Sequence, residues 1–98
     1  MFLAKVVGTV VSTRKHRAFQ GSKLLLLQPL VAQQRTLIPS GSSVVAIDAV
    51  GAGLDEFVMF TQGSSARLAA TTKDTPVDAI IVGIVDRVEL EGTTLERP

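Results

Sequence analysis

The sequence lacks cysteine, tryptophan and tyrosine, and it contains a single histidine among its 98 residues. The absence of cysteine excludes disulfides and thiolate metal sites, and it is usual in cytosolic proteins. His16 alone would leave a zinc ion without further imidazole or thiolate ligands. It also stands in a basic segment with no acidic residue nearby to orient its ring, as a catalytic triad requires. We therefore predict no metal, no cofactor and no triad.

Long apolar runs are missing as well. The stretch from Leu24 to Leu27 is as long as any in the chain, whereas a helix needs about 20 apolar residues to cross a bilayer. We expect no signal peptide, because Lys5 interrupts the apolar N-terminus and no small-residue cleavage site follows. The net charge of +1 is too small to indicate a nucleic-acid partner by itself.

Apolar residues are what the chain has in excess. They make up 46% of the sequence, while charged residues make up only 19%. A single domain of this length hides roughly two-thirds of the surface that its unfolded chain exposes. Because no membrane span is expected, the surplus apolar surface indicates a subunit interface.

Apolar and β-branched segments bounded by turn residues predict five strands. Ser64 stands where a helix N-cap would, and it predicts a short helical turn that ends at about Ala70. Residues 33–43 are rich in turn formers and predict a loop. Residues 89–98 are charged and either hang free or add a short edge strand. The predicted strands span residues 2–13, 22–31, 44–50, 56–62 and 77–88.

Five β-segments of irregular length with one short helix predict a mainly β protein, a small five-stranded Greek-key barrel of the OB-like type. We assign residues 1–90 to this barrel as one domain and residues 91–98 to a C-terminal tail. The outer face of a lone barrel should be polar. The strands predicted at 2–13, 56–62 and 77–88 are instead apolar on both faces, so we predict that the barrel packs against other copies of itself.

Two glycine-containing segments invite a nucleotide-binding or a catalytic interpretation. Residues 51–53 (Gly-Ala-Gly) begin like a dinucleotide fingerprint, but Glu56 stands where the third glycine is needed and a strand follows in place of a helix. The segment from Gly63 to Arg67 begins like a nucleophile elbow, but Arg67 replaces its closing glycine. We interpret both segments as structural turns.

Carboxylates near the strand ends could in principle form an acid–base pair. Turn hydrogen bonds and ion pairs with Arg67 or Arg87 explain them better, so we predict no enzymatic activity. These carboxylates belong to Asp48, Asp55, Glu56, Asp78 and Asp86.

One alternative function stays open on the residues. Small Greek-key barrels bind single-stranded nucleic acids by stacking bases on aromatic side chains along a basic groove. This chain has only four phenylalanines, and its main basic cluster runs from Arg14 to Arg17. We favour a solvated loop for that cluster and keep a single-stranded nucleic-acid-binding OB-type barrel as the alternative.

Four phrases of the sequence together resemble one protein family. They read AKVVGTVVSTRK, GSKLLLLQPL, AIDAVGAGLDEFVMFTQGSSAR and PVDAIIVGIVD, in that order. No single phrase is diagnostic, but the set resembles the EutN/CcmL family of bacterial microcompartment vertex proteins. The resemblance covers nearly the whole chain and leaves out only the tail and the loop at 33–43.

The resemblance implies a five-stranded OB-type barrel that assembles into a homopentamer and does not bind nucleic acid or membranes. Such pentamers occupy the vertices of polyhedral shells in the bacterial cytoplasm, of which carboxysomes are one kind. Hexameric and pseudohexameric shell proteins tile the flat facets and are the implied partners. A closed ring of this kind uses heterologous contacts, in which one face of each subunit meets a different face of the next.

The resemblance also marks the glycine turn and the GSSAR segment as subunit-interface or pore residues. Arg67 either bonds a neighbour's carboxylate or carbonyl groups or makes a contact within its own subunit, and both interpretations stay open. The family commonly reads G-A-G-x-G-E, and Asp55 replaces its third glycine, although aspartate tolerates left-handed backbone better than most residues. The candidate set is Asp48, Gly51, Ala52, Gly53, Asp55, Gly63, Ser64, Ser65 and Arg67.

Overall fold

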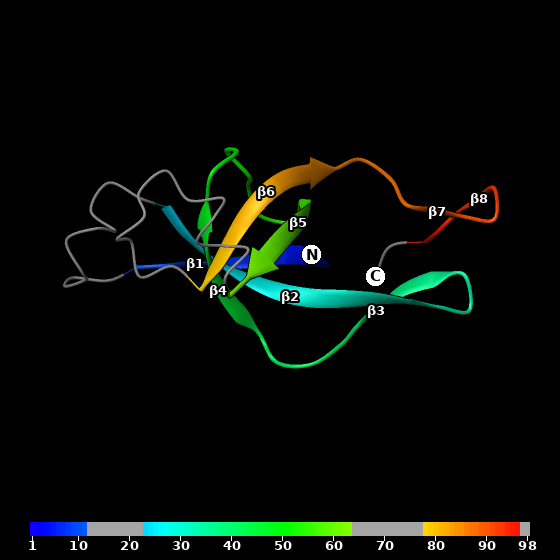
Figure 1. Ribbon diagram of the computed structural model, residues 1–98, viewed down its shortest axis with the longest axis horizontal. Helices are drawn as coiled ribbons and strands as arrows, with labels where there is room; N and C mark the ends of the chain where they lie inside the picture. Colours follow the sequence, from blue (N-terminus) through cyan, green and yellow to red (C-terminus); the bar gives the residue numbers. More distant parts are fainter. Residues whose placement is uncertain (12–22, 64–77, 97–98) are drawn as a thin grey trace.

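A computed structural model describes residues 1–11, 23–63 and 78–96, and strands dominate these ranges (Figure 1). No helix occurs in them, and the short helix predicted from Ser64 lies outside the described residues, as does the basic cluster at 14–17. Within the same ranges no helix is long and apolar enough to cross a membrane. The strands are β1 (Phe2–Val10), β2 (Lys23–Gln33), β3 (Thr36–Pro39), β4 (Val44–Asp48), β5 (Phe57–Gln62), β6 (Ala79–Val85), β7 (Glu89–Leu90) and β8 (Thr93–Thr94).

Five of the strands close into a ring. β1 pairs with β2 on one side and with β5 on the other, β5 pairs with β6, β6 with β4, and β4 with β2. Within this ring only the β4–β6 pairing is parallel, and it is limited to two residue pairs. A closed ring satisfies both edges of every strand in it, which removes the exposed edges on which open sheets aggregate. The predicted five-stranded barrel is confirmed.

The barrel is filled by the inward side of each strand, as the alternation of side chains in β-structure dictates. Two bulges bend the strands so that so short a sheet can close: one lies between Val6 and Gly8, the other between Met59 and Phe60. The core combines four alanines with larger aliphatic side chains and one phenylalanine. Its members are Ala4, Val6, Leu25, Leu27, Ala46, Ala52, Val58, Phe60, Ala79 and Ile81.

The loop predicted at 33–43 is partly wrong, because β3 lies inside it. Strand β2 continues to Gln33 and turns through Gln34 and Arg35 into β3. These two residues have φ of 50° and 68°, which is the left-handed pair of a type I′ hairpin. Such turns usually contain asparagine or glycine, so a Gln-Arg pair conceals this hairpin in the sequence.

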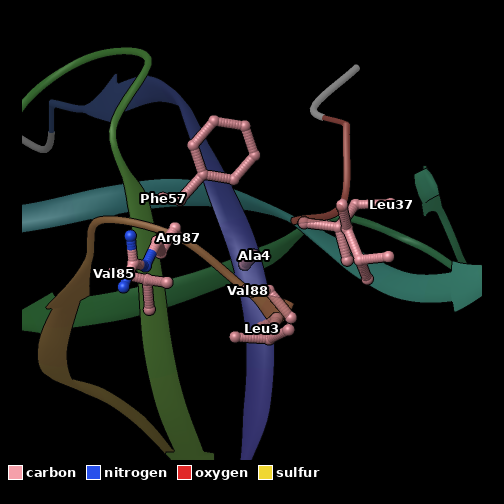
Figure 2. Close-up of a pocket in the computed structure, with 8 residues that line it drawn as sticks. Leu3, Ala4, Leu37, Phe57, Val85, Arg87 and Val88 are labelled. Carbon is pink, nitrogen blue, oxygen red and sulfur yellow. The ribbon is translucent and has the colours of Figure 1, made fainter. Parts of the chain in front are cut away.

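The segment after β6 folds back onto the barrel. β7 and β8 pair as a small hairpin, and the backbone of Glu96 bridges to Thr36 in β3. Leu95 is buried and joins a second apolar cluster on the outside of the barrel. Figure 2 shows most of this cluster, together with Ala4 and Arg87, around a cavity of only about 10 Å³. The cluster consists of Leu3, Leu30, Leu37, Phe57, Val85, Val88 and Leu95.

Candidate functional site

The connection between β4 and β5 begins with a carboxylate that organises the backbone after it. Asp48 Oδ1 accepts hydrogen bonds from the amide of Val50 at 3.0 Å and from that of Gly51 at 3.1 Å. Its side chain is only 2% exposed, and Lys23 Nζ lies 3.7 Å from its Oδ2. The same ammonium group donates to the carbonyl of Ala52 at 2.6 Å. Asp48 and Lys23 together therefore hold the turn against β2.

Ala52 anchors the glycine turn (residues 51–53) to the barrel core. This residue is fully buried in the barrel core, while its neighbour Gly51 takes φ of +79°. A side chain at Gly51 would meet nothing within 4 Å, so the left-handed backbone and not crowding within the subunit requires glycine there.

The second half of the connection is closed by a reciprocal pair of hydrogen bonds. The amide of Gly53 donates to Glu56 Oε1 at 2.6 Å, and the amide of Glu56 donates to the carbonyl of Gly53 at 3.2 Å. A Cβ on Gly53 would stand 3.3 Å from that carboxylate oxygen, a tight contact. Glycine at this position lets the Glu56 side chain fold back over the turn.

Asp55, the departure from the family pattern, keeps the backbone that glycine would adopt. Its φ is +68°, and its amide donates to the carbonyl of Val6 at 2.9 Å. The amide of Val6 in turn donates to the carbonyl of Glu56 at 2.9 Å. Lys5 Nζ lies 3.8 Å from the Asp55 carboxylate, which offsets the negative charge. The turn therefore persists with aspartate in it.

The predicted site residues are spread along the barrel. Gly53 and Asp55 precede β5, whereas Gly63 follows it with φ of +63°, so about 20 Å of strand separates the two turns. The amide of Gly63 donates to the carbonyl of Asp78 at 2.8 Å, which joins the end of β5 to the start of β6. Ser64, Ser65 and Arg67 lie outside the described residues.

Sequence reasoning missed two exposed apolar side chains on the β4–β5 connection. Val50 is 39% exposed and Leu54 is 65% exposed. Both belong to a connection whose backbone is held by the hydrogen bonds described above. Single exposed apolar side chains are common on protein surfaces, so these two gain weight only from their place on the turn that the family resemblance marks. In the sequence, Gly51 and Gly53 indicate a turn in this segment. No sequence pattern indicates that Val50 and Leu54 are exposed.

Side chains suited to other chemistry are few in the described ranges. Phe57 and Phe60 are buried, and only Phe2 is half exposed, with its ring 5.4 Å from that of Phe60. The described residues thus form no row of exposed rings on which bases could stack. No three histidine, aspartate or glutamate side chains of the described part gather as metal ligands would.

Comparison with known proteins gives consistent results. Residues 1–86 match the family model described as "Ethanolamine utilisation protein EutN/carboxysome". The microcompartment shell vertex protein GrpN of Rhodospirillum rubrum is 48% identical over 89 residues, which is 91% of this chain and 97% of GrpN. The carboxysome shell vertex protein CcmL of Gloeobacter violaceus is 44% identical over 97% of this chain and 92% of its own length.

Solved structures of such proteins have the same fold. The pentameric microcompartment shell protein GrpN superposes with a TM-score of 0.77 at 48% identity, covering 92% of this chain and 98% of that one. A structure of the ethanolamine utilization protein EutN superposes with a TM-score of 0.86 at 38% identity, covering 100% of this chain and 99% of that one.

Proposed function

Because this chain belongs to the EutN/CcmL family of bacterial microcompartment shell vertex proteins, we propose that five copies close into a ring that caps a shell vertex through the contacts described below. The resemblance predicted from the sequence is confirmed, as is the prediction of a structural and not an enzymatic role. The place of the protein is the microcompartment shell in the bacterial cytoplasm. The nucleic-acid alternative has no support from the described aromatic side chains.

The exposed apolar surface of the closed barrel is the observation that supports ring contacts best. The five strands of the barrel already pair on both edges, so strand pairing does not explain the apolar surface that remains. Exposed valines and leucines and Ile84 lie on several elements. Removing apolar surface from water stabilises association by about 25 cal/mol per Å². Contacts between copies are the most direct way for this surface to be buried.

We assign the glycine turn to a subunit contact or to the lining of a central opening. Its internal hydrogen bonds keep Val50 and Leu54 in fixed positions, so little conformational entropy is lost when a neighbour packs against them. Gly51 carries no side chain and has open space above it, which permits close approach of another subunit. Gly63 at the other end of β5 completes the described part of the proposed set, and Ser64, Ser65 and Arg67 follow it in the sequence.

The partners beyond the ring are, in our proposal, the hexameric and pseudohexameric shell proteins of the same compartment. Hexagonal units alone tile a plane, and a closed polyhedral shell needs five-fold units to introduce curvature. A pentamer that fills this position must contact hexamers along its outer rim. The vertex role carried by the names of the relatives supports this part of the proposal.

Native mass spectrometry tests the ring. The unmodified protein is expected as a pentamer at micromolar concentration, and Leu54→Asp should shift it towards smaller species, because the new carboxylate would be buried at the contact. Leu90→Asp is the matched control: Leu90 is 46% exposed but lies in the β7–β8 hairpin, so its ring should survive. A monomeric unmodified protein, or tight salt-sensitive binding to oligonucleotides, would refute the proposed function.

Mixing the pentamer with hexameric shell proteins from the same genome tests the second part. Electron microscopy should show closed polyhedral particles when the pentamer is present and sheets or open tubes when it is left out. Closed particles of unchanged shape in its absence would contradict the vertex role.

A further inference from the structure

An apolar patch covers the outside of the barrel where β1, β2 and β4 lie side by side. The strand registers place Gly8, Leu26 and Val45 in one row across the sheet, since Gly8 pairs with Leu26 and Leu26 with Val45. A second row follows two residues further along each strand and contains Val10, Leu24 and Ile47. Every residue of both rows is apolar. We call these six residues the β2–β4 face.

This face points away from the core and is open to contact. Leu25, Leu27 and Ala46, which alternate with it along β2 and β4, are buried in the barrel. Val45 by contrast is 49% exposed, and Gly8 has no side chain, with only Leu26 within 4 Å of where its Cβ would be. The face is therefore an apolar surface that carries no side chain at Gly8.

A groove lies on a different part of the same barrel, beside β5 and β6. It is open, has a volume of about 640 Å³, and is lined by Met59, Ile84, Val85, Asp86 and Arg87. Its floor is shaped by Gly83, since a Cβ there would come 2.7 Å from Met59 Cε. The methionine side chain lies over this glycine, and Ile84 is left 41% exposed. We call these five lining residues the β5–β6 groove.

We propose that the β2–β4 face of each subunit docks into the β5–β6 groove of the next copy around the ring. This inference rests on the proposed pentamer and adds which two surfaces meet. A cyclic ring with more than two members needs two different, complementary surfaces on every subunit. The described residues offer an apolar face and a groove in which Met59, Ile84 and Val85 lie beside the charged pair Asp86 and Arg87. Methionine packs readily against irregular apolar partners.

The order of strands in the barrel separates the β2–β4 face from the β5–β6 groove, as a heterologous contact requires. β1 stands between β2 and β5, and its face residues Gly8 and Val10 lie beyond the residues 2–5 that pair with β5. On the other side β4 meets β6 only at Ile80 and Ile81, near the start of β6, while the groove lies beside its last residues. The face also continues along the chain towards the β4–β5 turn, because Val50 comes two residues after the end of β4. The surface therefore joins the contact already proposed for Leu54.

Two single substitutions and their mixture test which surfaces meet. Val45→Asp blocks the face and Ile84→Asp blocks the groove, and both replace side chains that are partly exposed within one subunit. Native mass spectrometry should show each variant as a monomer, with circular dichroism unchanged. Val31→Asp is the matched control, because Val31 is on β2 and 45% exposed but pairs with β3 beyond the face. It should remain pentameric.

A one-to-one mixture of the two variants gives the decisive result. Each mixed pair retains one intact face and one intact groove, so the mixture should contain a dimer of one copy of each variant and no ring. A pentameric Val45→Asp variant, a mixture without mixed dimers, or a Val31→Asp control that falls apart equally would overturn the inference. All of these outcomes require a pentameric unmodified protein, so failure of the ring itself is recognised separately.

Cross-linking provides a measurement that does not depend on breaking the ring. The chain contains no cysteine, so a variant with both Val45→Cys and Ile84→Cys carries only the two introduced thiols. A short bismaleimide should join neighbouring subunits into a ladder that ends at five. Efficient covalent dimers from Val45→Cys alone would show that two identical faces meet, which would overturn the proposal.

Discussion

Asp48 provides the sharpest test of how the glycine turn is held. Replacing it by alanine removes the acceptor of the Val50 and Gly51 amides and the ionic partner of Lys23 at once. Asp48→Asn is the matched variant. An asparagine side-chain oxygen can accept the same two amide hydrogens, but it has no charge for the lysine.

The expected loss follows from these contacts. A hydrogen bond to a charged group contributes about 1.5–3 kcal/mol, but the Val50 and Gly51 amides are exposed and water can replace the carboxylate, so we take about 1 kcal/mol for each. The Lys23 pair adds about 0–1 kcal/mol, since its ammonium side chain is half exposed. Asp48→Ala should therefore lower the free energy of unfolding by about 2–3 kcal/mol, and Asp48→Asn by about 1 kcal/mol or less.

Urea unfolding and thermal melting measure this at one fixed protomer concentration, because ring formation couples stability to concentration. For a domain of this size Asp48→Ala corresponds to a fall in Tm of roughly 10–20 °C. A change below about 0.5 kcal/mol, typical of an ordinary surface substitution, would refute the anchoring role. Equal losses for alanine and asparagine would show that the charge, and not the acceptor geometry, holds the turn.

Two further changes should stabilise the protein. Replacing Gln34 and Arg35, both left-handed at the β2–β3 turn, by Asn and Gly should raise the urea midpoint by an amount worth about 1–2 kcal/mol; an unchanged midpoint would show that this turn carries no strain. Thr61 is buried and its Oγ1 has no hydrogen-bond partner among the described residues of the subunit, so Thr61→Val should gain about 1 kcal/mol in the same assay. A loss there would reveal that the hydroxyl group has a partner in the assembled ring.

Much of the barrel can be predicted from local patterns in the sequence. The five ring strands fall within the segments predicted for them, apart from the extension of β2 to Gln33, because alternating and continuous apolar runs bounded by turn residues are local signals. Strand β3 was not predicted, because its turn contains no glycine or asparagine and because its partner β2 also pairs with β4. The exposure of Val50 and Leu54 on the β4–β5 turn was not predicted, because exposure is a property of the folded surface.

What the sequence determined by itself are the features that depend on near neighbours in the chain. These include the five strands of the barrel, the turns at residues 51–53 and at Gly63, and the family to which the order of the motifs points. Only the tertiary structure decided that β1 closes the barrel by pairing with both β2 and β5, that Leu95 packs in one cluster with Leu37, and that Val45 faces outward. Each of these depends on contacts between residues far apart in sequence, where loop closure and packing in three dimensions select the partner.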